Sequence, residues 1–369
     1  MSSVFNVPSD KHRLFGLDFL RAAAVLFVVF GHSLILVPDS YKEFLRMFVL
    51  DGVSVFFVLS GFLIGGILIR QLEKNEPTVK LLVNFWKRRW LRTLPMYYVT
   101  LILLLGFYTY YKPEAIPDNI ELYFVFLQNF NTPQPNFFSE SWSLCVEEWF
   151  YLLVPLLLFG ILRWFKVSLR IALIILFLII CVSVTVNRWI HFDKAEIATV
   201  SDSMYFLTQV TMRLDAIVYG FIAAFIARFY EVFWRKMAHP LFVVLGFVLM
   251  YQIKFRLDEE QTVWIPVFKS LCIMIMLPFL SQWNIKKNIL TKGITLISKI
   301  SYSMYLVNLN IVLYIGVKFL VNGNLFSVHQ PGEYWVMEYL FFWTGTFILA
   351  YFFYRVIEIP FMNLRKREL

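Results

Sequence analysis

Residues 15–37 read FGLDFLRAAAVLFVVFGHSLILV, and this stretch decides the class of fold. An α-helix rises about 1.5 Å per residue, so about 20 apolar residues cross the hydrocarbon of a bilayer. This run is long enough, yet it carries Asp18, Arg21 and His32. Because ionisable side chains are costly inside a membrane, each of them is a candidate functional residue.

Apolar runs of similar length recur along the rest of the chain. Of its 369 residues, 59% are hydrophobic and 16% are charged, which excludes an ordinary soluble domain. The pattern predicts an all-α, polytopic membrane bundle of about ten transmembrane helices, near residues 15–37, 51–70, 94–111, 140–162, 168–190, 204–227, 238–253, 262–282, 296–321 and 335–357. The three cysteines fall inside these runs without metal-ligand spacing, so neither a disulfide nor a metal site is predicted.

The net charge of +9 comes from basic residues in the short connections, which argues against a nucleic-acid-binding face. With the N-terminus inside, the inner segments hold 22 Lys and Arg and the outer loops hold seven, so both termini are predicted to be cytoplasmic. The first run is too long for a signal peptide and ends without a cleavage pattern, so we expect it to be retained. The largest outer connection, 112–139, is long enough to fold over a site.

Arg21 and His32 are eleven residues apart, which returns a helix to nearly the same face and raises it by about 16 Å. One helix face therefore presents a cation on the inner side and an imidazole on the outer side. A histidine titrates near neutral pH and suits proton transfer, while a histidine held in the packing is the alternative. Asp18 and Arg21 could also neutralise each other, and the sequence leaves this open.

The fourth run opens with SWSLCVEEWFYLLVP, in which a helix points Glu147 and Glu148 about 100° apart. Only one of them can face the same cleft as His32. Glu147 is predicted at the depth of His32, where its carboxylate could accept from one ring nitrogen and leave the other basic. Pairing of either glutamate with an arginine is the alternative.

The segment NFWKRRWLRTLPMYY, between the second and third predicted spans, holds Arg88, Arg89 and Arg92. Arg89 and Arg92 are three residues apart and share a helical face, so they could clamp the phosphates of a cytoplasmic nucleotide-like donor. Anchoring of the helix at lipid headgroups explains the cluster equally well.

Two further runs carry polar groups. In MRLDAIVYGF, Arg213 and Asp215 are expected to pair with each other or with another buried partner. In FFVLSGFLIGG, Ser60 precedes Gly61 and Gly65, whose small-xxx-small spacing favours close helix packing.

Taken in order, these segments resemble the integral-membrane acyltransferase family 3, bacterial O-acyltransferases that modify surface sugars. The resemblance rests on LDFLRAAAV with its downstream His32, FFVLSGFLIG, RRWLRTLPMYY, SWSLCVEEWFYLLVP, RLDAIVYG, ISYSMYLVN and the closing EIP. Because these marks cover nearly the whole chain, residues 1–369 are interpreted as a single membrane acyltransferase domain. The periplasmic esterase-like domain fused to some members is not expected.

The resemblance implies a bacterial inner-membrane enzyme with a cytoplasmic acyl-CoA donor, usually acetyl-CoA, and a hydroxyl acceptor presented from the periplasm. It marks Arg21 and His32 as the central pair and places Arg89 and Arg92 on the donor side. The residues expected near the reacting groups or the substrate are Ser60, Trp142, Glu147, Tyr151, Arg213 and Asp215. The chain departs from the family pattern at Asn308, often a histidine, and at Ser54, often an acidic residue.

The predicted reaction is acyl transfer to a glycan hydroxyl, with acyl-CoA docked on Arg88, Arg89 and Arg92. His32, oriented by Glu147, is predicted to act either as a general base or as an acyl carrier. Candidate acceptors are a lipid-linked sugar, lipopolysaccharide O-antigen, capsule, exopolysaccharide, peptidoglycan and a small secreted molecule; membrane lipids and a separate periplasmic protein are candidate partners. A transporter of a small anionic or acylated substrate and a catalytically silent scaffold are the rival hypotheses.

We expect cysteines placed at either terminus to react with a membrane-impermeant reagent only after the membrane is opened. Cysteines placed in the 112–139 connection should react in intact cells, because the 22 to seven division of basic residues orients the bundle. Labelling of the C-terminus from outside would overturn this topology.

Overall fold

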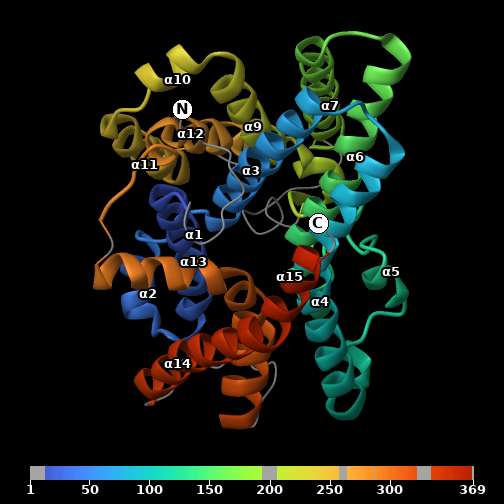
Figure 1. Ribbon diagram of the computed structural model, residues 1–369. Coiled ribbons are helices and arrows are strands. Elements are labelled where there is room, and N and C mark those ends of the chain that lie inside the picture. Colours follow the sequence, from blue (N-terminus) through green and yellow to red (C-terminus); the bar gives the residue numbers. More distant parts are fainter. Residues whose placement is uncertain (1–12, 193–205, 257–263, 287, 322–333, 368–369) are drawn as a thin grey trace.

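The computed structural model describes residues 13–192, 206–256, 264–286, 288–321 and 334–367, and within these ranges every regular element is a helix (Figure 1). Eight helical stretches are long and apolar enough to cross a membrane: Phe15–Leu36, Gly52–Lys74, Val79–Tyr111, Ser141–Phe165, Leu169–His191, Val210–Phe229, Ile289–Leu320 and Trp335–Leu364. The other two predicted spans correspond to shorter apolar helices, Pro240–Phe255 and Ile265–Leu280. The predicted polytopic helical bundle is confirmed.

The elements follow one another in chain order, with short helices in the connections. They are α1 (Phe15–Ser33), η1 (Leu34–Leu36), α2 (Asp39–Arg46), α3 (Gly52–Lys74), α4 (Val79–Tyr111), η2 (Pro113–Ala115), α5 (Glu121–Phe124), η3 (Asn136–Phe138), α6 (Ser141–Phe165), α7 (Leu169–Phe192), α9 (Val210–Phe229), α10 (Glu231–Lys236), α11 (Pro240–Arg256), α12 (Ile265–Leu280), α13 (Ile289–Val307), η5 (Asn308–Val321), α14 (Trp335–Phe353), η6 (Tyr354–Glu358) and α15 (Ile359–Arg367).

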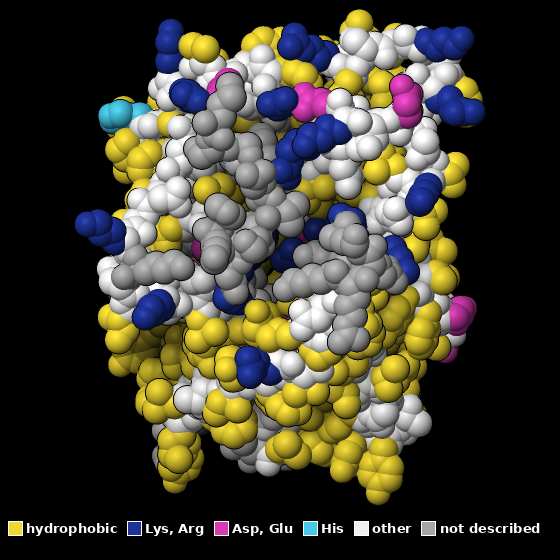
Figure 2. Space-filling view, viewed as in Figure 1, with side chains coloured by type: hydrophobic (Ala, Val, Ile, Leu, Met, Phe, Trp, Pro, Cys, Tyr) yellow, Lys and Arg dark blue, Asp and Glu magenta, His cyan; other side chains and the backbone are white. Residues whose placement is uncertain are grey.

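Charged and apolar side chains lie mainly on different halves of the face shown in Figure 2. Lys and Arg are concentrated over the upper half of the face shown, near α10, and a nearly continuous hydrophobic surface covers the lower half. Such a division suits a protein whose two ends meet different environments. Lys11 and Lys287, which enter the count of inner basic residues, lie outside the described residues.

Helices α3 and α9 cross with their backbones almost in contact. A Cβ atom added at Gly61 would lie 1.8 Å from the carbonyl oxygen of Ile217, and one added at Gly220 would lie 1.9 Å from that of Val58. Only glycine permits this approach, since any side chain would overlap the opposing backbone. The predicted packing role of Gly61 is therefore confirmed, and its partner is α9.

The predicted boundary of the third span at residue 94 is wrong, because α4 already begins at Val79. The Thr78 hydroxyl caps its first turn by accepting a hydrogen bond from the Leu81 N–H at 3.3 Å. The helix then continues through the arginine cluster and through Pro95. Arg89 and Arg92 consequently project from a continuous helix rather than from a connection between two helices.

Helix α13 changes its winding at one residue. It runs as an α-helix to Val307 and continues from Asn308 as the π-helix η5. π-helical turns are rare and often occur at functional sites, because they redirect side chains relative to a regular helix. This change of winding falls next to α1, against which α13 packs extensively.

We expect Gly61→Ala to lower the free energy of unfolding by about 1–3 kcal/mol or more, because its methyl group overlaps the Ile217 carbonyl. Gly106→Ala is the matched control, since nothing lies within 4 Å of a Cβ atom added there. Thermal unfolding of the two purified variants in detergent measures the difference. Equal melting temperatures would show that the α3–α9 crossing tolerates a side chain.

Candidate active site

A cavity lies among α1, α3, α4, α6 and α13. Its volume, measured as the space open to the centres of water-sized molecules, is about 90 Å³. The polar side chains that line it are Arg21, Ser60, Arg89, Arg92, Thr93, Ser143, Glu147, Tyr151, Ser301, Tyr302 and Tyr305. Of the residues predicted for the site, it therefore brings together Arg21, Ser60, Arg89, Arg92, Glu147 and Tyr151.

Positive charge predominates in this cavity. Along α1, the acidic residue nearest to Arg21 is Asp18. Asp18 forms an ion pair with Arg13, whose Nε donates to the Asp18 carboxylate at 2.8 Å. In the described part of the chain, Arg21 and Arg92 make no side-chain hydrogen bond or ion pair, and the carboxylates of Glu147 and Glu358 act on them only at longer range. Three guanidinium groups thus share a cavity with one carboxylate, that of Glu147, an arrangement suited to an anionic ligand.

Tyr151 joins the polar groups of three helices. Its hydroxyl donates to the Glu147 carboxylate at 3.2 Å, lies 2.6 Å from the Ser60 hydroxyl, and accepts from Arg89 at 3.2 Å. The Arg89 guanidinium also lies over the Tyr151 ring, 4.7 Å from its centre. In the contact between Ser60 and Tyr151 either hydroxyl can be the donor.

The two adjacent glutamates of α6 point to different places, as predicted from helix geometry. Glu147 faces the cavity, whereas Glu148 is buried and accepts a hydrogen bond from the Thr93 hydroxyl at 2.7 Å. Glu148 therefore belongs to the contact between α4 and α6.

The predicted pairing of His32 with Glu147 is wrong. Nδ1 of His32 lies 2.5 Å from the side-chain oxygen of Asn308, and Glu147 is bonded to Tyr151 instead. The reason is the order of the helices, since α1 packs along α3 and α13 and not along α6. His32 itself does not line the cavity.

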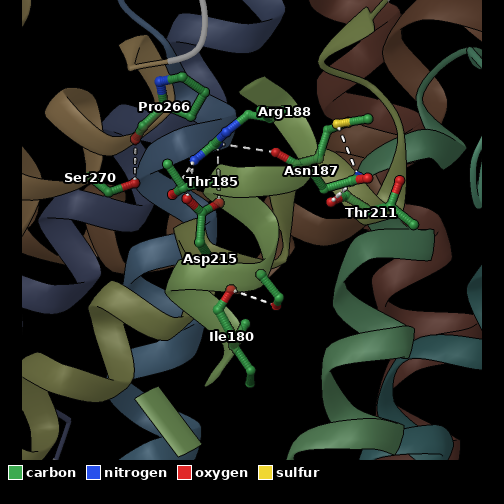
Figure 3. A network of polar contacts seen from close by, with 10 residues as sticks. Ile180, Thr185, Asn187, Arg188, Thr211, Asp215, Pro266 and Ser270 are labelled. Atoms are coloured by element: carbon green, nitrogen blue, oxygen red, sulfur yellow. Dashed lines mark hydrogen bonds and ion pairs between the residues drawn. The ribbon is translucent and has the colours of Figure 1, made fainter. Parts of the chain in front are cut away.

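Arg213 and Asp215 do not pair with each other. Asp215 forms an ion pair with Arg188 of α7, whose Nη2 lies 2.5 Å from its carboxylate. Figure 3 shows this fully buried pair with Thr185 beside it. Arg213 instead donates to the Ser54 hydroxyl at 3.0 Å and lies near the ring of Trp142. The ion pair between Arg188 and Asp215 joins α7 to α9, and loss of either partner would leave the other as a costly unpaired buried charge.

Arg88, Trp142, Arg213 and Asp215 lie outside the cavity lining, although each was predicted for the site. Arg213 remains close to it through Phe57, a lining residue whose ring centre lies 5.6 Å from the guanidinium carbon. The sequence did not identify Arg188 as the partner of Asp215, because residue spacing does not show that α7 packs against α9.

Glu140, at the start of α6, was also missed. Its buried carboxylate accepts from the backbone N–H of Asn310 at 3.0 Å and from the Asn310 side chain. This contact fixes the first turn of η5 against α6, beside Tyr305, whose hydroxyl donates to the Glu140 backbone carbonyl at 3.1 Å.

Comparison with known proteins connects this site with a family. Residues 14–355 match the sequence model of a family described as an acyltransferase domain. The chain belongs to this family, acyltransferase family 3. No solved structure matches the chain.

Two relatives of this acyltransferase illustrate the similarity. The O-acetyltransferase OatA of Staphylococcus aureus (strain NCTC 8325 / PS 47) is 29% identical over 370 aligned positions, which cover 94% of this chain and 56% of the relative. The peptidoglycan O-acetyltransferase OatA of Listeria monocytogenes is 33% identical over 166 positions, covering 41% of this chain and 25% of the relative. The chain thus spans little more than half the length of the first relative.

Both departures of this acyltransferase from the family pattern have a structural counterpart. Asn308 occupies the position of a frequent histidine and contacts His32. Ser54 occupies the position of a frequent acid, but its hydroxyl donates to the Asp51 carboxylate at 2.8 Å and so links Asp51 to Arg213. Lys269 also donates to the Asp51 carboxylate, at 2.9 Å.

We expect Glu147→Gln to reduce acyl transfer by about 10-fold or more, because it removes the one carboxylate in the cavity and changes the hydrogen bonding of Tyr151. Glu148→Gln is the matched control, since Glu148 does not line the cavity and the Gln side-chain oxygen can still accept from Thr93. Turnover per folded protein measures both variants. Equal losses would remove the assignment of Glu147 to the site.

Proposed function

We propose that this acyltransferase is a membrane-bound O-acyltransferase of the bacterial inner membrane. It moves an acyl group, in the first instance acetyl, from cytoplasmic acyl-CoA to a hydroxyl of a surface or secreted glycan. The observation that carries the proposal is the cavity, in which three arginines, Arg21, Arg89 and Arg92, line the same space as the Ser60, Glu147 and Tyr151 cluster, an excess of positive charge. The names of the relatives, which act as O-acetyltransferases, support the choice of group and acceptor atom.

The donor fits the charge of the cavity. Coenzyme A carries phosphates at one end and a thiol at the end of a long pantetheine arm. Guanidinium groups bind phosphate through paired, charge-assisted hydrogen bonds, so Arg89 and Arg92 hold the phosphates while the arm extends past Tyr151. Arg21, on the neighbouring helix, adds the third charge to the same cavity.

The acyl group is transferred at the outer end of this cavity. Tyr305 lines it, and Asn308, which holds His32, follows Tyr305 by three residues on the same helix face. His32 accepts the proton of the acceptor hydroxyl while the hydroxyl oxygen forms a bond to the acyl carbon. The thioester C–S bond breaks, and the proton passes from His32 to the departing thiolate of CoA.

The acceptor is proposed at the level of its chemistry, a sugar hydroxyl that approaches from the periplasm. Peptidoglycan is the first candidate because the Listeria relative is named for it. A separate periplasmic protein is a proposed partner that passes the acyl group to the glycan. Release of thiol from acetyl-CoA that depends on the acceptor tests the function, because a transporter or a scaffold leaves the thioester intact.

We expect Arg89→Ala and Arg92→Ala each to raise the KM for acetyl-CoA about tenfold or more, because each lost charge-assisted hydrogen bond costs about 1.5–3 kcal/mol. The KM for the acceptor should change little. Arg88→Ala, from the same cluster but outside the cavity lining, is the matched comparison and should have the smaller effect. Unchanged binding in the Arg89 and Arg92 variants would mean that the donor enters elsewhere.

A further inference from the structure

The hydrogen bonds of Asn308 fix which way its amide group points. Its side-chain nitrogen donates to the backbone carbonyl of Met304 at 2.9 Å and to that of Tyr305 at 2.7 Å. Two carbonyl oxygens can be satisfied only by the NH₂ end of an amide, and both of its hydrogens are then used. The amide oxygen is left to face His32.

The position of the His32 proton follows from this. Nδ1 lies 2.5 Å from the Asn308 oxygen, and an amide oxygen can only accept, so Nδ1 carries the hydrogen. A flipped ring would place a carbon at this distance, far closer than the roughly 3.3–3.6 Å of a C–H···O contact. A neutral imidazole has one N–H, which leaves Nε2 with its lone pair.

The surroundings of this pair differ on its two sides. Asn308 is fully buried at the first residue of η5, where the change of helical winding and its two backbone contacts hold it in place. His32 keeps part of its surface accessible. The acceptor oxygen is therefore rigid while the imidazole remains reachable.

We propose that Asn308 is a positioning residue that holds His32 in the Nδ1–H tautomer and presents Nε2 as the base for the acceptor hydroxyl. The proposal rests on the proposed function for its catalytic consequence. Its geometric part is independent of that function. It also gives a role to a position at which the chain departs from its family.

The control for this proposal lies two residues further along the same helix. Asn310 is equally buried and also makes buried hydrogen bonds, but its partner is Glu140 rather than His32. Loss of either amide removes a buried polar contact, so both variants lose stability. Only loss of Asn308 leaves the imidazole without its acceptor.

The tautomer is measured directly by ¹⁵N NMR of protein labelled at histidine in lipid nanodiscs. The chain has five histidines, so subtraction of the spectrum of His32→Gln isolates the His32 signals. We expect a protonated Nδ1 and an unprotonated Nε2 in the native protein. A proton on Nε2 would overturn the proposal, and this readout needs neither donor nor acceptor.

The kinetic consequence is measured on Asn308→Ala and Asn310→Ala. We expect Asn308→Ala to lower kcat about 100-fold with the KM for acetyl-CoA unchanged, since a wrongly oriented base loses most of its contribution. Asn310→Ala should keep the native kcat per folded protein. Equal kcat values would overturn the catalytic part of the proposal.

A third variant keeps the acceptor for His32 and removes the two donors. Asn308→Asp retains an oxygen that can accept from Nδ1–H but cannot donate to the carbonyls of Met304 and Tyr305. Per folded protein it should keep more turnover than Asn308→Ala; the reverse order contradicts the proposal. If native protein shows the Nδ1–H tautomer but releases no thiol from acetyl-CoA, the proposed function fails alone. If thiol release requires His32 but the tautomer is reversed, the role of Asn308 fails alone.

Discussion

The ion pair between Arg13 and Asp18 shapes the charge of the candidate site, because it engages the acid nearest to Arg21 along α1 and leaves it acting on Arg21 only at longer range. Asp18 also accepts from the Ser298 hydroxyl at 2.7 Å, so this carboxylate is committed to the contact between α1 and α13. Arg21, one turn further along α1, then lines the cavity and makes no hydrogen bond or ion pair within the described part of the chain, with Asp18 and Glu147 acting on it at longer range. An unpaired guanidinium in such surroundings is costly unless a ligand supplies the opposite charge.

Elsewhere in the described bundle, ion pairs join neighbouring parts of the chain. Arg188 and Asp215 join α7 to α9, and Lys269 joins Asp51 next to the Ser54 contact with Arg213. The close α3–α9 crossing at Gly61 holds this framework together and places the neighbouring Ser60 against Tyr151. The cavity itself is lined by three guanidinium groups and one carboxylate, an excess of positive charge that suits an anionic substrate.

Much of the fold and part of the site follow from the sequence. Spanning length and hydropathy predict the helices, and the 100° turn per residue separates Glu147 from Glu148, because both depend on one helix at a time. The partner of His32 depends instead on which helix lies beside α1. The predicted depths placed Glu147 and His32 at the same level of the membrane. The helix that lies beside α1 there is α13, which contributes Asn308. Arg188 was missed as the partner of Asp215 for the same reason, since the spacing of residues within one helix does not show which helices pack against it.

The most direct test of this account is the position of a bound donor. A cryo-EM structure with a hydrolysis-resistant acetyl-CoA analogue should show phosphates within hydrogen-bonding distance of Arg89 and Arg92, with the acyl end directed along Tyr151 toward His32. Density for the analogue on another face of the protein, with no density for it in the cavity among α1, α3, α4, α6 and α13, would contradict the account.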